Sequence, residues 1–341
     1  MASPQWLPVE FAERRWRPLS RHLRERFGAK VYRVTVDAGF TCPNVDGTVA
    51  KGGCVYCDNE SFSPNRRLPR RTIREQVVAG INRVRERHDA EKFLVYFQAA
   101  TNTWAPIDKL RRLYDEAVDH PAVSGLIIGT RPDCVGEPVL DLLESYARRM
   151  YVSLELGLQT IHDASLDWMN RGHGFASFVD AVDRCEGRPL ELCAHVILGL
   201  PGETHDEMLA TADVLGSLPI HAAKVHNLHV VRETPLAKMH ERGEVRMLEF
   251  DEYVSLMCDF LERLPPHVVI QRLNGDAPPK YLLAPAWCLD KAKLLAAIQA
   301  EFMRRDSWQG KRWKPEAGRE RIEHARRRRP LSLAKSSPSC G

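Results

Sequence analysis

The chain is organised around the stretch TCPNVDGTVAKGGCVYCDN, residues 41–59, which carries cysteines at positions 42, 54 and 57. Two residues separate Cys54 from Cys57, a gap short enough for both sulfurs to reach one metal centre. Eleven residues separate Cys42 from Cys54, so Cys42 can bring a third thiolate from the far side of the loop. Iron–sulfur clusters are held by cysteine thiolates, and three thiolates on a four-iron cluster leave one iron open to another ligand. The spacing therefore favours an iron–sulfur cluster.

A zinc site is the main alternative for the same three cysteines. Structural zinc takes four protein ligands. His88, Cys134 or a more distant residue could be the fourth, although none lies at a standard spacing nearby. Three unrelated thiols are the remaining interpretation. The spacing alone leaves all of these open.

The composition indicates a soluble globular chain with room for a large core. Of its 341 residues, 44% are hydrophobic and 28% are charged, which is ordinary for such proteins. No run approaches the roughly 18 apolar residues of a membrane span, and the N-terminus lacks the pattern of a secretory signal. We therefore expect a cytoplasmic protein without membrane contact. Nine cysteines in such a chain favour metal or redox chemistry over disulfides.

The basic residues gather in three places, and the net charge is +4. Such clusters are commonly solvated faces, but they can also contact the phosphates of a nucleic acid. The clusters comprise Arg14, Arg15, Arg17, Arg21, Arg24 and Arg26; Arg66, Arg67, Arg70, Arg71 and Arg74; and Arg326 to Arg329.

Predicted strands and helices alternate along the chain. Probable helix starts are the capping boxes Thr72–Glu75 and Thr204–Glu207. Alternation of this kind predicts βαβ units and a parallel sheet, whose ligands bind at the C-terminal ends of the strands. The three-cysteine loop follows the first strand and so lies at that end. The predicted strands are 31–36, 93–97, 125–130, 151–156, 192–198 and 222–230, and a further strand and turn at 268–276 is expected to close the barrel edge.

Seven stretches of the chain together carry a family resemblance. They are VDAGFTCPNVDGT (36–48), GGCVYCDN (52–59), YFQAATNTW (96–104), GTRPDC (129–134), LELGLQT (154–160), HVILGLPGET (195–204) and KVHNLHV (224–230). With these stretches the chain resembles the radical S-adenosylmethionine (SAM) enzymes, and most closely the YhcC-type family, which is related to the radical SAM domain of the Elongator catalytic subunit. The aromatic Tyr56 before the last cysteine fits the superfamily pattern. The eleven-residue gap is longer than the commonest gap of three, but it fits the YhcC type.

The resemblance implies a fold and a domain organisation. The fold is an α/β, partial (βα)6 TIM-like barrel with a C-terminal α/β extension. We expect an N-terminal arm and helix at 1–30, the radical SAM core at 31–235, the extension at 236–305, and a basic, flexible tail at 306–341.

The resemblance also implies cofactors and site residues. Cys42, Cys54 and Cys57 would hold a 4Fe–4S cluster whose open iron binds SAM. Arg131 would neutralise the SAM carboxylate or pair with Asp133. Glu203 would pass near the adenine or stabilise a helix start. The remaining expected contacts are Gln98, Thr101 and Asn102 near the SAM amino group, and Glu155 and Gln159 near the ribose or carboxylate.

The favoured function is a radical SAM enzyme that modifies RNA, with tRNA uridine as the expected substrate and a reduced flavodoxin or ferredoxin-type protein as electron donor. One alternative is radical chemistry on a small metabolite. The other is a non-catalytic, zinc-stabilised nucleic-acid-binding protein. Acyl transfer is not expected, because about 55 residues after Pro285 are too few for an acetyltransferase domain. Methylthiolation is also disfavoured, because the other cysteines lack the spacing of a second cluster.

Overall fold

Seven parallel strands form the main sheet of the computed structural model, which describes residues 11–63, 65 and 71–328. The strands lie in the order β1–β2–β3–β4–β5–β6–β8, and every neighbouring pair is parallel. Parallel neighbours need a crossover connection, commonly a helix, which explains the alternation seen in the sequence. The strands are β1 Val31–Val36, β2 Lys92–Phe97, β3 Val123–Thr130, β4 Tyr151–Gln159, β5 Glu191–Leu198, β6 Ala222–Asn227 and β8 Val269–Arg272, and β7 Val230–Val231 pairs antiparallel with β9 Leu282–Ala284.

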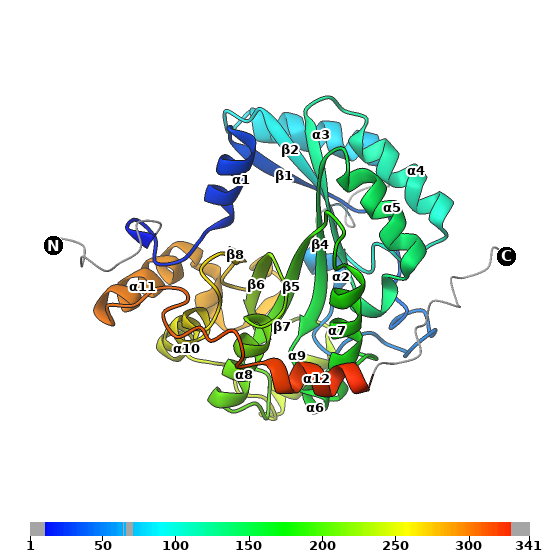
Figure 1. The fold of residues 1–341 in the computed structure, drawn as a ribbon. Helices are drawn as coiled ribbons and strands as arrows, with labels where there is room; N and C mark the ends of the chain where they lie inside the picture. The colour runs from blue at the N-terminus through cyan, green and yellow to red at the C-terminus, as the bar shows by residue number, and fades with distance from the viewer. Residues whose placement is uncertain (1–10, 64, 66–70, 329–341) are drawn as a thin grey trace.

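Helices cover the outer face of the curled sheet (Figure 1). Both predicted capping boxes are confirmed, at the starts of α3 Ile73–Arg85 and α8 His205–Leu215. The helices are α1 Leu19–Phe27, α2 Asn59–Phe62, α3 Ile73–Arg85, α4 Ile107–Val118, α5 Glu137–Ala147, α6 Asp163–Trp168, α7 Phe175–Arg184, α8 His205–Leu215, α9 Pro235–Glu241, α10 Phe250–Glu262, α11 Lys291–Arg304 and α12 Arg319–Arg327, with the 3-10 turns η3 Pro132–Cys134 and η4 Ala286–Leu289.

The side chains of β2 show how the two faces of the sheet are filled. Phe93, Val95 and Phe97 pack with the outer helices in the largest hydrophobic cluster. Leu94 and Tyr96 alternate with them and point into the barrel, as the two-residue period of a strand requires. The barrel interior is therefore a separate compartment, apolar at one end and polar at the other.

Helix α1 fills the apolar end of the barrel. Leu23 packs there against Leu94, Ile127 and Tyr151, while His22 pairs with Glu191 at the start of β5 at 3.1 Å. This end carries the N-terminal ends of the strands. The N-terminal segment thus belongs to the barrel itself and seals it opposite the end where ligands bind.

The N-terminal basic cluster lies at this sealed end, where three of its six arginines pair with carboxylates. Arg17 and Arg21 both pair with Glu25, Arg26 lies 3.7 Å from Glu191, and Arg15 is buried. The first basic cluster therefore lies at the opposite end of the barrel from the cysteine loop. Residues 66–70, which carry part of the second cluster, and Arg329 of the third lie outside the described residues.

The edges of the sheet are β1 and β8, which makes the structure an open partial barrel, as predicted. Strand β8 comes from the segment predicted to close the barrel edge, so the sheet extends beyond the expected core of 31–235. Across the gap, the Arg33 guanidinium donates to Gln271 Oε1 at 3.3 Å, and the backbone N–H of Ile270 donates to the carbonyl of Arg17 at 2.8 Å.

The segment from residue 306 to 328 is ordered, in contrast to the expected flexible tail. Gln309 is fully buried and donates to the carbonyls of Pro265 and Val268 at 2.7 and 2.8 Å. The Trp313 indole donates to the carbonyl of Gly216 at 2.8 Å, so it packs on the body of the protein. The polar composition of this segment predicted a flexible tail. In the structure, the polar groups of Gln309 and Trp313 instead donate hydrogen bonds to backbone carbonyls of the barrel. Residues 329–341 are outside the described part.

Candidate functional site

The cysteine loop starts beyond the C-terminal end of β1 and is pinned from two sides. Within it, the N–H of Cys57 bonds to the carbonyl of Cys54 at 2.9 Å, which makes the tight turn between the two cysteines. The N–H of Val55 donates to the carbonyl of Met169 at 3.1 Å, and its carbonyl accepts from the N–H of Leu236 at 2.9 Å. The loop is therefore held by the segment after α6 and by the start of α9.

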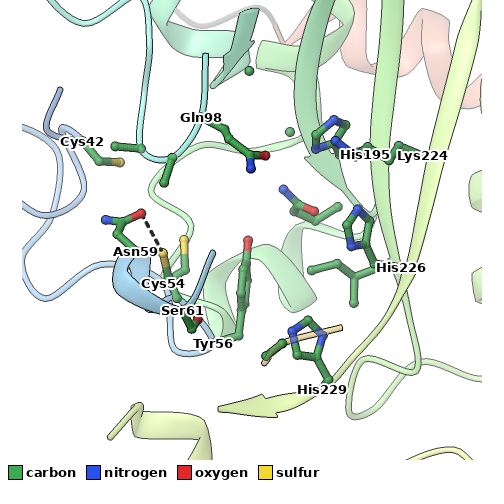
Figure 2. Close-up of a pocket in the computed structure, with 18 of the residues that line it drawn as sticks. Cys42, Cys54, Tyr56, Asn59, Ser61, Gln98, His195, Lys224, His226 and His229 are labelled. Carbon is green, nitrogen blue, oxygen red and sulfur yellow. Dashed lines mark hydrogen bonds between the residues drawn. The ribbon is translucent and has the colours of Figure 1, made fainter. Parts of the chain in front are cut away.

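All three loop cysteines line one cavity of about 890 Å³ at the C-terminal ends of the strands. Figure 2 shows Cys42 and Cys54 on one side of it. The Cys57 thiol donates to Asn59 Oδ1 at 3.8 Å. Burial and the neighbouring sulfurs of Cys54 and Cys42 raise the pKa of the Cys57 thiol to about 12. Three thiolates here would repel one another, so the site calls for a positively charged occupant.

The spacing of these sulfurs is wider than a single ion needs. Tetrahedral zinc with bonds of about 2.3 Å holds its sulfurs roughly 3.8 Å apart. Among the described residues, Glu155, Cys193 and His195 form a group whose metal-binding atoms all lie within 4.8 Å of one another. The three loop cysteines do not form such a group in that part of the chain. A cluster of several irons, with one cysteine on each of three, fits the wider spacing better than zinc does.

A buried arginine that the sequence analysis missed lies against this centre. The Arg171 guanidinium is 3.5 Å from Cys54 Sγ and donates to the carbonyl of Gly157 at 2.9 Å. Burial opposes its charge, but the nearby Tyr56 and Cys54 groups raise its pKa, so it stays protonated. Asn44 Nδ2 lies 3.6 Å from the same sulfur. Both groups can stabilise negative charge on that sulfur.

Gly157 is required by the position of this guanidinium. A Cβ at Gly157 would overlap the Arg171 guanidinium and would come within 2.8 Å of the Gln159 side-chain amide. The glycine in the predicted LELGLQT stretch therefore makes room for a buried cation.

Gln98, Thr101 and Asn102, expected near SAM, all line the cavity in the loop after β2. The Thr101 N–H donates to the carbonyl of Thr41 at 3.2 Å, which joins this loop to the cysteine loop. Asn102 donates to the carbonyls of Ala99 and Gly129 at 3.0 and 2.8 Å. Its Oδ1 is buried and has no hydrogen-bond partner among the described residues, so an acceptor is available for a ligand.

Arg131 lines the cavity but already has an anionic partner. Its guanidinium donates to both oxygens of Asp133, at 2.9 and 2.7 Å, and to the carbonyl of Arg171 at 2.8 Å. The pKa of Asp133 is lowered despite burial, by His173 and then by Arg131. Of the two expected roles, the structure contains the ion pair with Asp133.

Glu155, Gln159 and Glu203 occupy three different settings. Gln159 lines the cavity, with a positive φ of 74°. Glu155 is fully buried and is absent from the cavity lining, but its Oε1 has no partner among the described residues. Glu203 is also absent from this lining; burial raises the pKa of its carboxyl, and its Oε1 has no hydrogen-bond partner among the described residues.

A polar layer forms the part of the barrel interior next to the cavity. Glu155 Oε2 accepts from His195 Nε2 at 2.7 Å and from Lys224 Nζ at 3.0 Å, and Lys224 also donates to Tyr96 Oη at 2.7 Å. Because the Lys224 ammonium occupies this carboxylate, the compact Glu155–Cys193–His195 group is an ion-paired network and not a metal site. The sequence analysis missed this layer.

The residues present fit a 4Fe–4S cluster with SAM beside it. The three cysteines open onto the cavity together with the predicted loop Gln98–Asn102. The unmatched Oδ1 acceptor of Asn102 suits a ligand that brings ammonium or hydroxyl donors, as SAM does.

Comparison with known proteins agrees with the geometry. Residues 47–215 match the radical SAM superfamily, and residues 220–304 match the radical SAM C-terminal domain. The chain belongs to the radical SAM superfamily: it is an enzyme of the class that uses a 4Fe–4S cluster and SAM. A non-catalytic zinc protein is therefore rejected.

Within this superfamily, the chain is similar to two proteins of the family expected from its motifs. It is 39% identical to the uncharacterized protein YtqA of Bacillus subtilis, over 89% of this chain and 94% of the relative. It is 40% identical to protein YhcC of Escherichia coli, over 78% of this chain and 85% of the relative. The YhcC-type resemblance is confirmed.

More distant matches connect the chain to the Elongator branch. It is 27% identical to a tRNA uridine(34) acetyltransferase of Methanocaldococcus jannaschii, over 48% of this chain and 30% of that relative. The solved structure of Elp3 from Methanocaldococcus infernus has a TM-score of 0.62 at 17% identity and covers 82% of this chain and 64% of that one. This structure confirms the partial-barrel fold.

Proposed function

We propose that Cys42, Cys54 and Cys57 bind the 4Fe–4S cluster, that SAM binds between them and the loop Gln98–Asn102, and that the substrate is a tRNA uridine. When bound, the cluster and SAM together supply a 5′-deoxyadenosyl radical that removes a hydrogen atom from the substrate. The observation that carries the proposal is the convergence of three cysteine sulfurs and the Arg171 guanidinium on one cavity.

The protein's own residues orient and enclose the reactants. Arg171 and Asn44 stabilise charge on the Cys54 sulfur. Asn102 ties its loop to β3 and offers Oδ1 to a cofactor donor, and Gln159 contributes a polar side chain to the cavity wall. Glu155 does not line the cavity and acts through its contacts with Lys224 and His195, which do.

The tRNA substrate is supported by the relatives of the Elongator branch. One relative is a tRNA uridine(34) acetyltransferase, and the shared region covers 48% of this chain. This support is for the substrate class and not for acetylation. We further propose a cytoplasmic enzyme reduced by a flavodoxin or ferredoxin-type protein; none of the helices in the described ranges is long and apolar enough to cross a membrane.

Anaerobic reconstitution tests the cofactor part of the proposal. Wild-type protein should bind about four irons and release 5′-deoxyadenosine from SAM on reduction. Cys54→Ala should lose both, while Cys185→Ala, a change at a buried cysteine at the end of α7, should retain both. Full activity in Cys54→Ala would contradict the assignment.

Nucleoside analysis tests the substrate part. Digested tRNA from a deletion strain should lack or accumulate one modified uridine relative to wild type, and the gene should restore it, whereas a gene encoding Cys54→Ala should not. Unchanged tRNA would overturn the substrate proposal and favour radical chemistry on a small metabolite.

A further inference from the structure

The cavity has a basic wall on the side that faces the cysteines. Figure 2 shows His195, Lys224 and His226 across the open space from Cys42 and Cys54. The wall comes from strands β1, β5, β6 and β8, and it includes the two edges of the open barrel. We define the basic wall as Arg33, His195, Lys224, His226 and Arg272.

The cations of the basic wall outnumber the carboxylates that face them. Lys224 is matched by the buried Glu155. Arg272 lies 3.4 Å from Asp276, but these side chains are 31% and 40% exposed, and such a pair contributes little. Arg33 donates to the neutral Gln271, and among residues 11–63, 65 and 71–328 no carboxylate lies within 4.0 Å of it. The wall therefore carries positive charge that the described chain does not balance.

The other titratable groups show the effect of this crowding. Burial and then the charge of Arg272 lower the pKa of His226 well below its usual range, so this imidazole is neutral. Burial lowers the pKa of Lys224, Glu155 opposes that change, and Arg33 and Arg272 add to it. His226 Nε2 is shielded from solvent and lacks a hydrogen-bond partner in the described part of the chain. A negatively charged ligand would relieve the repulsion.

We propose that the basic wall binds an oxyanion, a phosphate or a carboxylate, carried by the substrate, with Arg33 and Arg272 as its charged ligands. Guanidinium groups present paired N–H donors that match the oxygens of such anions. The proposed function assigns the cluster and SAM to the cysteine side of the cavity, which is opposite the basic wall. An oxyanion on the basic wall would therefore belong to the substrate, and this part of the inference rests on the proposed function. The gap between β1 and β8 brings the two arginines to the open edge of the barrel.

Thermal unfolding of the cluster-loaded protein tests anion binding without any substrate. At constant ionic strength, 10 mM inorganic phosphate or 10 mM acetate is compared with chloride. For a dissociation constant of about 1 mM, the favoured anion should raise the unfolding temperature by about 2 °C. The anion that acts identifies the source as phosphate or carboxylate. The Arg33→Gln/Arg272→Gln double variant should show no rise, whereas Arg83→Gln on the outer helix α3 should respond like wild type.

The outcomes separate this inference from the proposed function. No rise in wild type, or an equal rise in the double variant, overturns the inference even if tRNA proves to be the substrate. Iron content and 5′-deoxyadenosine release from SAM alone should stay within about twofold of wild type in the double variant, which shows that it folds and keeps the cofactor site. If the double variant does not fold, Arg33→Lys and Arg33→Gln replace it. Arg33→Lys should keep the anion-dependent rise in unfolding temperature, and Arg33→Gln should lose most of it. Equal rises in both variants would overturn the inference.

Discussion

The Arg171 guanidinium lies 3.5 Å from the sulfur of Cys54, although the two residues are 117 positions apart in the chain. The contact joins the cysteine loop to the segment between α6 and α7. Neighbouring contacts hold the same junction: Asn170 donates to the carbonyls of Lys51 and Gly53 at 3.1 and 2.8 Å. The electrostatic environment of the proposed cluster is thus set partly by a segment that contributes no cysteine.

Loss of the Arg171 charge should make the cluster harder to reduce. Hydrogen bonds to cluster sulfurs tune the reduction potential, and a nearby positive charge favours the more negative, reduced state. If the charged contact contributes about 1.4 kcal/mol, Arg171→Gln should lower the midpoint potential by about 59 mV for one electron. A redox titration followed by electron paramagnetic resonance measures this, with the exposed Arg148→Gln as control. An unchanged potential in a variant with full iron content would remove the assigned role.

The sequence predicted the parts of the site that local chemistry defines. Cysteine spacing located the proposed metal loop, and the Thr72–Glu75 and Thr204–Glu207 pairs located two helix starts. Arg171 was missed because it lies outside every predicted strand and every motif stretch. A signal was present in the neighbouring residue types, because asparagine and glycine tolerate positive φ. In the structure, Asn170 and Gly172 adopt φ of 52° and 72° and interrupt the helix.

The basic wall was missed for a different reason. Arg33 and Lys224 each sit within a predicted strand, where period two shows only that they share a face with their second neighbours. Whether that face meets solvent or a barrel interior depends on the curl of the sheet and on the packing of helix α1 in the barrel end. Both depend on contacts between residues far apart in the sequence. Tertiary packing, not local pattern, makes these residues part of the cavity.

The buried Glu155–Lys224 pair should behave as a coupled unit. Lys224→Met leaves the Glu155 carboxylate without its ammonium partner in a fully buried position, and breaking a buried pair costs about 3–5 kcal/mol. The Glu155→Gln/Lys224→Met double variant removes both charges and should lose less stability than Lys224→Met alone. Urea unfolding of the wild type, both single variants and the double variant measures the coupling. Strictly additive losses would show that the pair is not coupled.

Shortening the Leu23 side chain of helix α1 should destabilise the barrel at its sealed end. Leu23 is buried against Leu94, Ile127 and Tyr151, and a buried leucine-to-alanine change costs about 2–5 kcal/mol. Urea unfolding of Leu23→Ala should show a loss in this range. Leu289→Ala, at a side chain that is 45% exposed, should change stability by less than about 0.5 kcal/mol. Equal effects would mean that α1 does not contribute to the barrel core.

His173 should make the folded protein less stable in mild acid. Burial, and then the charge of Arg171, lower its pKa from 6.5 to about 3. Between these values the unfolded chain binds a proton that the folded chain does not, so stability falls as pH decreases below 6.5. One pKa unit corresponds to about 1.4 kcal/mol, so His173 should account for a loss of about 2 kcal/mol between pH 6.5 and pH 5. Urea unfolding of wild type and His173→Gln at both pH values measures the contribution of His173. The variant has no imidazole to protonate at this position, so its free energy of unfolding should fall by about 2 kcal/mol less than that of wild type between pH 6.5 and pH 5. Identical pH dependence in both proteins would show that His173 titrates normally in the folded state.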